Sequence, residues 1–452
     1  MTANKISPSF NSLITWFSSK EKGPNQWRIG TEHEKFIYKL DGFAPVVYEG
    51  DAGIEAILHY LSETYGMTPI LEKEKIVALK TIDGASISLE PGGQLELSGN
   101  VVKTLHDSCC ETNKHLKQML DVTSKLGLGM IGSGFHPTAS RDEINWMPKG
   151  RYKIMRNYMP KVGNLGLDMM LRTCTIQTNL DYQDEEDMSR KFKTSLALQP
   201  VATALFANSP IKDGNLTDIK SNRAMVWTDT DPERCGVPSC VFDTNFGYEQ
   251  WVDYVLDVPM YFIYRKGQYL DVAGKSFRRF MNSDNKDEFF GYTASMSDFE
   301  HHITTVFPDV RLKGYLEMRG ADGGPWSIIC ALPALWVGLL YDSESLQKAE
   351  AIANLFSHQD VVNARISAAK DGLNGQIGSK NIHEVATQLI EIAEMGLKTR
   401  SRLNKNGEDE RIFLKPLKTI IDSGLSQADI VRDLYYKEWN EDINNAYSHY
   451  KY

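Results

Sequence analysis

The chain has 452 residues and a net charge of −9 at pH 7. This acidic balance argues against nucleic acid or an anionic membrane surface as a partner, although local arginines can still bind a small anionic substrate. Hydrophobic residues make up 42% of the chain and charged residues 24%, which is ordinary for a globular protein with a sizeable core.

Several classes of targeting signal are absent from the sequence pattern. No run approaches the roughly 18 consecutive apolar residues of a membrane span. Residues 1–20 carry a short, interrupted apolar patch and no small-residue cleavage site, which is not typical of a signal or transit peptide. Six cysteines without a C-x-x-C pair give neither a disulfide framework nor a zinc site. We therefore expect a cytoplasmic protein.

The first third of the chain predicts a mixture of helices and strands. A short amphipathic helix is expected within residues 8–19, and apolar residues at helical spacing predict a second helix that ends at Gly66. Two alternating runs within residues 76–90 flank Asp83–Gly84, which is a turn signal and predicts a hairpin. A long helix follows at about 102–126.

The rest of the chain continues this pattern and then becomes helical. Residues 173–182 are rich in β-branched side chains and predict a strand, and a helix follows that ends before Pro210. Residues 249–272 predict a helix and a hairpin, and residues 311–324 a strand that runs into a glycine-rich loop. We expect one α+β domain over 1–452, with a body at 1–342 that carries the functional sheet and a mainly helical portion at 343–452 packed on it.

The strand segment RIGTEHEKF places two glutamates one residue apart. Because side chains alternate along a strand, Glu32 and Glu34 share one face and His33 lies on the other. Two carboxylates this close repel each other unless a positive group lies between them.

The same arrangement recurs in three further segments. A solvated polar face is the simpler interpretation of any single strand, but four strands rich in Glu, Gln, Asn and Arg favour a shared polar site. The residues expected to share such faces are Glu90 with Glu96, Gln177 with Asn179, and Glu317 with Arg319. Oxygen ligands without cysteine select hard cations, so the pattern predicts Mg²⁺ or Mn²⁺ serving a nucleotide polyphosphate.

Phosphoryl chemistry also needs fixed cations, and arginine binds carboxylate or phosphate through two parallel hydrogen bonds. The candidates are Arg151, Arg156, Arg223 and Arg319. The chain has no GxxxxGK[ST] loop and no GxGxxG after a strand, which disfavours P-loop and Rossmann enzymes.

Taken together, these motifs resemble the plant-type glutamate–cysteine ligases, which plants share with some proteobacteria. The resemblance runs from about residue 27 to residue 341 and continues more faintly to the C-terminus. The segments that carry it are RIGTEHEKF, SLEPGGQLELSG, GRYKIMRNYMPKVGNLGLDMMLRTCTIQTNLDY, LALQPVATALFANSP, VWTDTDPER and YLEMRGADGGPW.

The resemblance implies a fold and a reaction. The fold would be glutamine-synthetase-like, with a curved, mainly antiparallel sheet surrounded by helices and the site on its concave face. The reaction would join the γ-carboxylate of glutamate to the amine of cysteine through a γ-glutamyl phosphate. This first step of glutathione biosynthesis would use ATP as co-substrate and Mg²⁺ or Mn²⁺ as the metal. The protein would be a monomer or a homodimer.

The resemblance also implies roles for single residues. Arg151 and Arg223 would hold the α-carboxylate of glutamate, and Trp227 would contact substrate. Arg319 and Glu317 would be catalytic, with Arg319 steadying the phosphoryl group. The metal ligands would be Glu32, Glu34, Glu90, Glu96, Gln177 and Glu317. No residue is assigned to the adenine pocket.

Two cysteines match positions that form a redox-sensitive disulfide in plant members of this family. These are Cys109 and Cys330, and the resemblance implies that oxidation links them and raises activity. A pair of buried free thiols, as a reducing cytosol favours, is the equally weighted alternative.

Other functions fit the same residues. One alternative is a ligase of the same fold that joins glutamate to another amine, or a guanidino phosphotransferase. The amine pocket, expected near Trp227 and Tyr261, would decide between the amines. Another alternative is a non-catalytic metal-binding protein with this fold, which the filled acidic and basic positions argue against.

Overall fold

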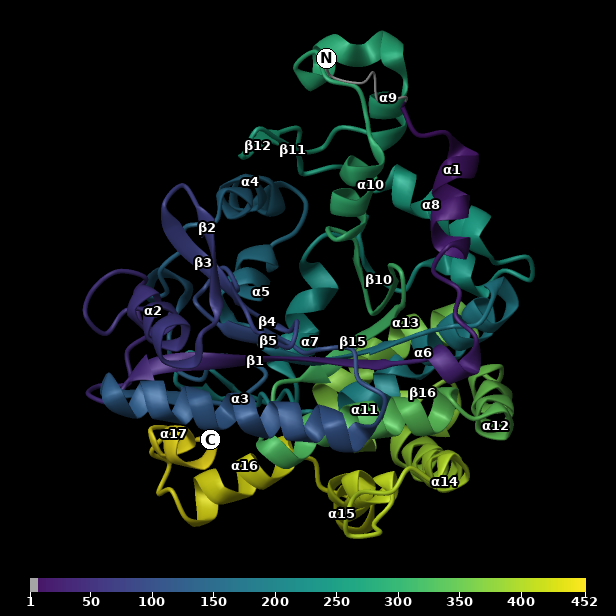
Figure 1. Ribbon diagram of the computed structural model, residues 1–452. Coiled ribbons are helices and arrows are strands. Elements are labelled where there is room, and N and C mark those ends of the chain that lie inside the picture. Colours follow the sequence, from purple (N-terminus) through teal and green to yellow (C-terminus); the bar gives the residue numbers. More distant parts are fainter. Residues whose placement is uncertain (1–6) are drawn as a thin grey trace.

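The computed structural model describes residues 7–452, apart from the side chains of residues 283, 285 and 286. At its centre is a nine-stranded sheet built around the eleven-residue strand β1 (Ile29–Lys39) (Figure 1). The strand order is β14-β15-β7-β1-β5-β4-β3-β2, with β6 paired to the far part of β1. Neighbouring strands along this path are antiparallel. The predicted α+β fold, with a mainly antiparallel sheet surrounded by helices, is therefore confirmed.

The strands of the central sheet are short apart from β1. Besides β1, they are β2 (Thr68–Glu72), β3 (Lys75–Lys80), β4 (Ser86–Leu89), β5 (Leu95–Ser98), β6 (Leu128–Ile131), β7 (Thr175–Leu180), β14 (Val310–Leu312) and β15 (Leu316–Asp322). Two-stranded pairs outside the sheet are β8 (Ile211–Lys212) with β9 (Asn215–Leu216), β10 (Cys235–Gly236) with β13 (Phe307–Pro308), β11 (Phe262–Arg265) with β12 (Gln268–Asp271), and β16 (Gln376–Ile377) with β17 (Lys380–Asn381).

Helices surround the sheet. In the first half of the chain they are α1 (Phe10–Ser18), α2 (Ile54–Tyr65), α3 (Leu105–Lys125), α4 (Gly150–Tyr158), α5 (Gly166–Arg172), α6 (Glu185–Leu205) and α7 (Asn222–Val226). In the second half they are α8 (Tyr248–Asp257), α9 (Phe277–Met281), α10 (Met296–Ile303), α11 (Trp326–Leu340), α12 (Ser343–Ala353), α13 (His358–Asp371), α14 (Ile382–Arg400), α15 (Lys415–Ser423), α16 (Gln427–Lys437) and α17 (Asn445–His449).

Local signals in the sequence explain several helix boundaries. The side chain of Thr104 accepts a hydrogen bond from the Asp107 amide and caps the start of α3. Helix α2 ends at Gly66, which adopts the left-handed conformation with φ 66° that glycine tolerates best. Asp184 caps α6 in the same way as Thr104 caps α3, and α6 ends before Pro210 as expected.

Apolar side chains pack the sheet against its helices in two large clusters. One cluster joins the inner faces of β7, β14 and β15 to α6 and α11, with Ile176, Leu316 and Met318 fully buried. The other joins β3, β4 and β5 to α2 and α3. His33 lies on this packed side, where its ring contacts that of His115 on α3. The opposite face of β1 carries Glu32 and Glu34, and a cavity separates it from residues of α4, α5 and α7.

The C-terminal helices extend the core beneath the sheet (Figure 1). Helix α14 packs against α11, α12 and α6. Gly338 on α11 and Gly396 on α14 allow this close approach, because a Cβ added at Gly396 would come within 2.0 Å of the Gly338 carbonyl oxygen.

Two segments differ from the sequence prediction. Residues 311–324 were expected to form one strand, but the chain reverses at Lys313, whose amide donates to the Tyr315 carbonyl, and forms the hairpin β14–β15. The segment ISLEPGGQLELSG is likewise a hairpin, in which Glu90 and Gln94 close the turn between β4 and β5. In the second hairpin Gly93, with φ 86°, adopts the left-handed conformation that glycine tolerates best. In both segments strand alternation alone indicates continuity.

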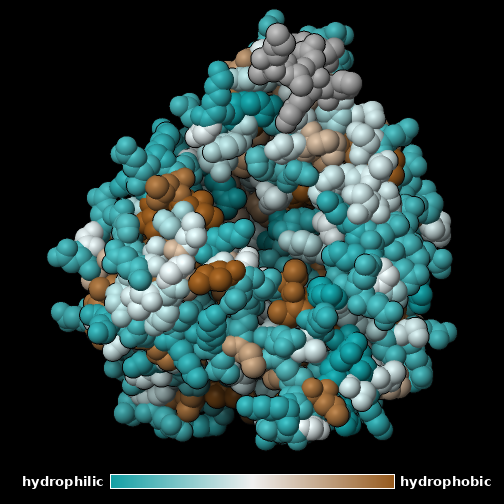
Figure 2. Space-filling view, viewed as in Figure 1, coloured by the Kyte–Doolittle hydropathy of each residue, from teal (hydrophilic) through white to brown (hydrophobic). Residues whose placement is uncertain are grey.

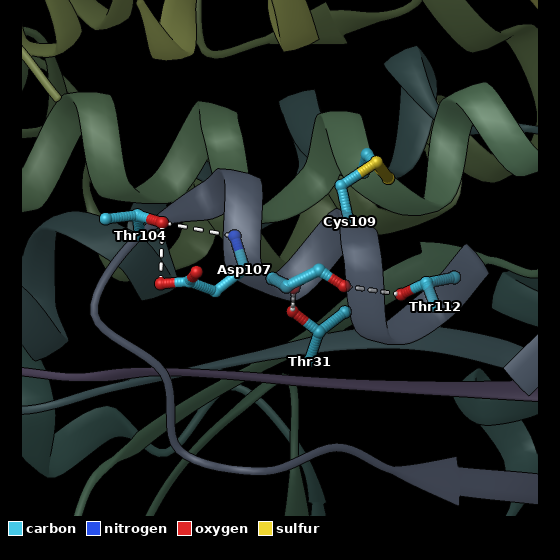
Figure 3. The surroundings of a disulfide bond; sticks show 7 residues. Thr31, Thr104, Asp107, Cys109 and Thr112 are labelled. Atoms are coloured by element: carbon cyan, nitrogen blue, oxygen red, sulfur yellow. Dashed lines mark hydrogen bonds between the residues drawn. A yellow bond between two sulfur atoms is a disulfide. The ribbon is translucent and has the colours of Figure 1, made fainter. Parts of the chain in front are cut away.

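Cys109 on α3 and Cys330 on α11 have their sulfur atoms at bonding distance, with Cα atoms 5.7 Å apart (Figure 3). The bond joins two helices separated by 221 residues in the sequence. On the side of α3 toward the sheet, the Ser108 and Thr31 hydroxyls are hydrogen bonded at 2.7 Å, so α3 is fixed both to β1 and to α11. Cys110, the next residue, is exposed.

Among residues 7–452, no single helix has both the length and the apolar composition of a membrane span. Only α11 and α12 taken together pass that test, and the two helices are bent by 94° where they join.

Candidate functional site

The polar faces of four strands meet on one side of the sheet, as the sequence predicts. In the pairing register, Glu32 on β1 lies opposite Gln177 on β7, and Glu34 lies opposite Glu96 on β5. Glu317 on β15 lies opposite Asn179. Side chains directly opposite each other in antiparallel strands have Cβ atoms about 5 Å apart, so the carboxylates form one continuous acidic surface.

This surface forms the floor of a cavity of about 350 Å³. The space-filling view shows the molecule hollowed near the centre of this face, above the level of β1, and hydrophilic residues line the visible part of the recess (Figure 2). The residues predicted from the sequence that line the cavity are Glu32, Glu34, Glu90, Glu96, Arg151, Gln177, Arg223, Trp227 and Arg319.

The two glutamates of β1 are buried among other carboxylates. Burial, together with the nearby charges of Glu317 and Glu96, raises the pKa of Glu32 to about 7. Burial, followed by the charges of Glu90 and Glu96, also holds the pKa of Glu34 well above its usual value. This side of the cavity therefore carries more negative charge than its own side chains neutralise.

Glu317 has the opposite environment. Its carboxylate forms ion pairs with Arg311 at 2.7 Å, Arg319 at 2.8 Å and Lys313 at 3.1 Å. Burial alone would raise the pKa of Glu317, but these three cations, with Arg311 contributing most, hold it well below its usual value. Glu317 was predicted as a metal ligand, a role that stays a prediction, and in this structure three cations surround it.

The arginines predicted to bind substrate also line the cavity, Arg151 from α4 and Arg223 from α7. Arg223 is 4% exposed and donates from Nη2 to the Arg319 carbonyl at 2.9 Å, so it lies beside the cation cluster. Arg151 Nε, Arg223 Nε and Trp227 Nε1 are buried without a hydrogen-bond partner among the described residues. Other atoms of these three side chains line the cavity.

Two residues singled out in the sequence lie elsewhere. Arg156 sits on the outer side of α4, with its guanidinium 4.8 Å from the ring of Trp146, and does not line the cavity. Tyr261 is buried behind the site, with the Arg234 guanidinium 3.9 Å from its ring centroid. It does not line the cavity either, so only Trp227 of the two expected pocket residues does so.

Sequence reasoning missed several residues that line the cavity. The most important are Arg311 and Lys313, which belong to β14 and the turn after it. The signal that was available is the K-G pair in RLKGYLEMRG, which marks a turn and would have placed Arg311 directly opposite Glu317. The others include Ser98, Tyr152, Thr304, Thr305 and Tyr315.

The acidic side of the cavity is the place where a cation fits. Its carboxylates raise one another's pKa values, which is the electrostatic signature of missing positive charge. No three His, Cys, Asp or Glu side chains of residues 7–452 are already grouped around one point as a metal site would require. The carboxylates have the chemistry of a divalent-cation site, because oxygen ligands suit hard cations.

The comparisons with known proteins identify relatives over nearly the whole chain. The family model for glutamate-cysteine ligase family 2 (GCS2) matches residues 28–449. The chain is 46% identical to chloroplastic glutamate–cysteine ligase B of Oryza sativa subsp. japonica, over 97% of this chain and 86% of that protein. It is also 46% identical to the chloroplastic enzyme of Arabidopsis thaliana, over 97% of this chain and 82% of that protein.

A solved structure shares the fold. The glutamate–cysteine ligase of Francisella tularensis, solved in complex with AMP, superposes with a TM-score of 0.55 at 12% identity, covering 94% of this chain and 88% of that one.

These relatives correct the expected location. The chain was expected to be cytoplasmic, but the similar plant enzymes are named as chloroplastic, which points to a plastid and overturns that expectation. Composition could not reveal this, since the body of the protein has no chemistry specific to either compartment. The extent of the family match and the level of identity with these relatives decide the assignment: the chain belongs to glutamate–cysteine ligase family 2.

Proposed function

We propose that this protein joins the γ-carboxylate of L-glutamate to the amine of L-cysteine in an ATP-dependent reaction, the first step of glutathione biosynthesis. The observation that carries the proposal is that one cavity brings together an acidic floor, a cluster of three cations around Glu317, and Arg151 and Arg223. The similar Francisella enzyme was solved with AMP, which agrees with an adenine nucleotide as co-substrate.

Glutamate binds beside Arg151 and Arg223, which both line the cavity. Their side chains suit the α-carboxylate, because guanidinium groups bind carboxylates through paired, charge-assisted hydrogen bonds. Trp227 lines the same cavity. Fixing the α-carboxylate here directs the γ-carboxylate toward the acidic floor and the cation cluster.

The acidic floor binds the divalent cations. Glu32, Glu34, Glu90 and Glu96 would hold Mg²⁺ or Mn²⁺, with the amide oxygen of Gln177 as a further hard ligand. When bound, the metal offsets the repulsion between the phosphates of ATP and the incoming carboxylate. Gln177 Oε1 also accepts a hydrogen bond from Arg319 at 2.7 Å, so it links the floor to the cation cluster.

Arg311, Lys313 and Arg319 serve the phosphoryl group. A γ-carboxylate oxygen of glutamate attacks the γ-phosphorus of ATP, ADP leaves, and γ-glutamyl phosphate forms. The deprotonated amine of cysteine then attacks the acyl carbon, and inorganic phosphate leaves with the former carboxylate oxygen. Positive groups fixed beside the transferred phosphoryl group stabilise the charge that spreads over its oxygens. Glu317 holds these cations in place, since it pairs with each of them.

The direct test is ADP release by the purified protein with ATP, Mg²⁺, glutamate and cysteine, followed by mass identification of γ-glutamylcysteine. We expect turnover that requires all four components, and Glu34→Gln should lower kcat/KM by at least about 100-fold because one carboxylate of the metal floor is lost. A panel with α-aminobutyrate and polyamines tests the acceptor. Turnover with a polyamine and none with cysteine would leave the chemistry intact but reject the named acceptor.

Lys313→Met tests the cation cluster. The change removes one positive charge beside Glu317 while Arg311 and Arg319 still pair with it. We expect kcat to fall by roughly 100-fold with KM for glutamate changed less than about threefold, because the charge is needed in the phosphoryl-transfer step. Lys125→Met, at an exposed position on α3, is the matched control. An unchanged kcat in Lys313→Met would remove Lys313 from the mechanism.

The raised pKa of Glu32 predicts a pH-dependent stability of the metal-free protein. The folded state binds the proton of the Glu32 carboxyl more tightly than the unfolded state does. The contribution of this group to the free energy of unfolding is therefore largest at low pH and is lost as pH rises toward about 7. Glu32→Gln removes the titrating group. In EDTA, the variant should match the wild type near pH 5 and exceed it by about 3 kcal/mol at pH 8, measured by urea unfolding.

The control for this experiment is Glu63→Gln, at an exposed position on α2. Its urea-unfolding curve should follow the wild type at both pH values. Adding Mn²⁺ at pH 8 should raise the free energy of unfolding of the wild type more than that of Glu32→Gln. Parallel pH profiles for the wild type and Glu32→Gln would contradict the proposed electrostatics.

The Cys109–Cys330 bond is proposed to stabilise the active protein. In the chain-entropy model, a link across 221 residues lowers the conformational entropy of the unfolded chain. This raises the free energy of unfolding by about 5 kcal/mol. Dithiothreitol should therefore lower the free energy of unfolding, slow ADP release and change mobility on a non-reducing gel. Cys330→Ser should behave as the reduced protein does, and Cys110→Ser should keep the response. Identical mobility and activity with reductant and oxidant would reject this role.

A further inference from the structure

Helix α7 is short, yet it positions two groups that line the cavity. It carries Arg223, and the turn directly after it carries Trp227. A helix of five residues has too few internal hydrogen bonds to fix its own orientation. The contacts at its first residues therefore determine where Arg223 points.

Those contacts converge on one buried carboxylate, Asp322 at the end of β15, which is 1% exposed. Asp322 Oδ2 accepts hydrogen bonds from the Ser209 hydroxyl at 2.6 Å and from the Asn208 amide at 2.9 Å. Asp322 Oδ1 accepts a hydrogen bond from the Ser221 hydroxyl at 2.7 Å. Both oxygens are thus held by fixed donors, and no ion pair within 4 Å involves Asp322 in the part of the chain that the structure describes.

The same two hydroxyls hold the backbone of α7. Ser221 Oγ accepts a hydrogen bond from the Ala224 amide and caps the helix, and Ser209 Oγ accepts one from the Arg223 amide at 3.3 Å. Each serine gives its single proton to Asp322 and accepts from α7. The carboxylate therefore fixes the direction of both hydroxyls and, through them, the start of the helix.

A β-bulge explains why Asp322 faces α7. Between Met318 and Ala321 the pairing of β15 with β7 shifts by one residue. Without the shift, Asp322 would share the apolar face of Met318. With it, Asp322 lies opposite Thr175 and shares the polar face of Glu317 and Arg319. The space around it is tight, because a Cβ at Gly134 would come within 2.3 Å of Asp322 Cγ.

The network also ties the substrate arginine to the strand that carries the phosphoryl arginine. Arg223 Nη2 donates to the carbonyl oxygen of Arg319, and the charge of Asp322 attracts the guanidinium of Arg223. Asp322 does not line the cavity. It can act on substrate only through Arg223, so its role differs from that of the residues that contact substrate.

We propose that Asp322 is a positioning residue for glutamate binding, which orients Arg223 through the hydroxyls of Ser209 and Ser221. This rests on the proposed function, in which Arg223 holds the α-carboxylate of glutamate. Strand β15 thus carries the residue that orients Arg223 as well as Glu317 and Arg319. The affinity for the amino-acid substrate then depends on a carboxylate that does not touch it.

Asp322→Asn removes the charge and turns one acceptor into a donor that faces the donors around it. We expect KM for glutamate to rise about tenfold, the effect of about one charge-assisted hydrogen bond, while KM for ATP and for cysteine changes less than about twofold. Steady-state kinetics with each substrate varied in turn gives this split. A folded Asp322→Asn protein with unchanged KM for glutamate, or with all three KM values raised together, would overturn the proposal.

A second pair of variants keeps the test valid if Asp322→Asn does not fold. Ser221→Ala removes one hydroxyl and should raise KM for glutamate about threefold, whereas Ser221→Thr keeps the hydroxyl and should stay near the wild type. A general loss of packing would not be rescued by threonine. Equal effects of Ala and Thr would therefore reject the hydroxyl network.

Two further variants show whether a negative result contradicts the positioning role of Asp322 or the proposed glutamate site itself. Glu410→Gln changes another buried carboxylate, which accepts from the Leu105 amide at the start of α3, and should lower stability without changing the ratio of the three KM values. Arg223→Lys tests the glutamate site itself. If Arg223→Lys raises KM for glutamate and Asp322→Asn does not, only the positioning role fails. If Arg223→Lys has no effect either, both the glutamate site and the inference fail.

Discussion

The structure depends on how one buried cavity balances its charge. Strand alternation turns Glu32 and Glu34 to the same side of β1, and the antiparallel register places Glu96 beside them. Carboxylates in such a place are unfavourable unless cations neutralise them. The chain neutralises only part of this charge itself, through the three cations at Glu317 and through Arg223 near Glu34, and leaves the rest for groups that bind.

Because the neutralisation is only partial, the cavity has both cationic and anionic regions. Positive charge from the protein is concentrated at β14–β15, where Arg223 lies beside Arg319, and at Arg151 near Glu90. A carboxylate substrate and a polyphosphate can each bind to these cations, and the anionic floor accepts the ions that allow them to approach. Shape alone would not orient two anions toward each other, but this charge pattern does.

Much of this arrangement was predictable from local rules. The period of two predicts the shared face of Glu32 and Glu34, and helical spacing with a terminal glycine predicts α2 and its end at Gly66. The prediction that the polar faces of four strands share one site required a further assumption, that their carboxylates bind a common cation. The resemblance to a known family then supplied the reaction, which spacing alone does not determine.

The features that were missed depend on register. Only the Lys313–Gly314 pair in this strand-like pattern indicates that the chain reverses, and that reversal brings Arg311 and Lys313 to Glu317. The period-two pattern of a strand does not reveal the bulge in β15 either. Applied without the bulge, it assigns Asp322 to the apolar face. A one-residue shift thus converts a core position into the anchor of α7. Contacts of this kind are decided by the pairing of strands distant in the sequence, so local patterns locate the polar faces but not the partners that complete them.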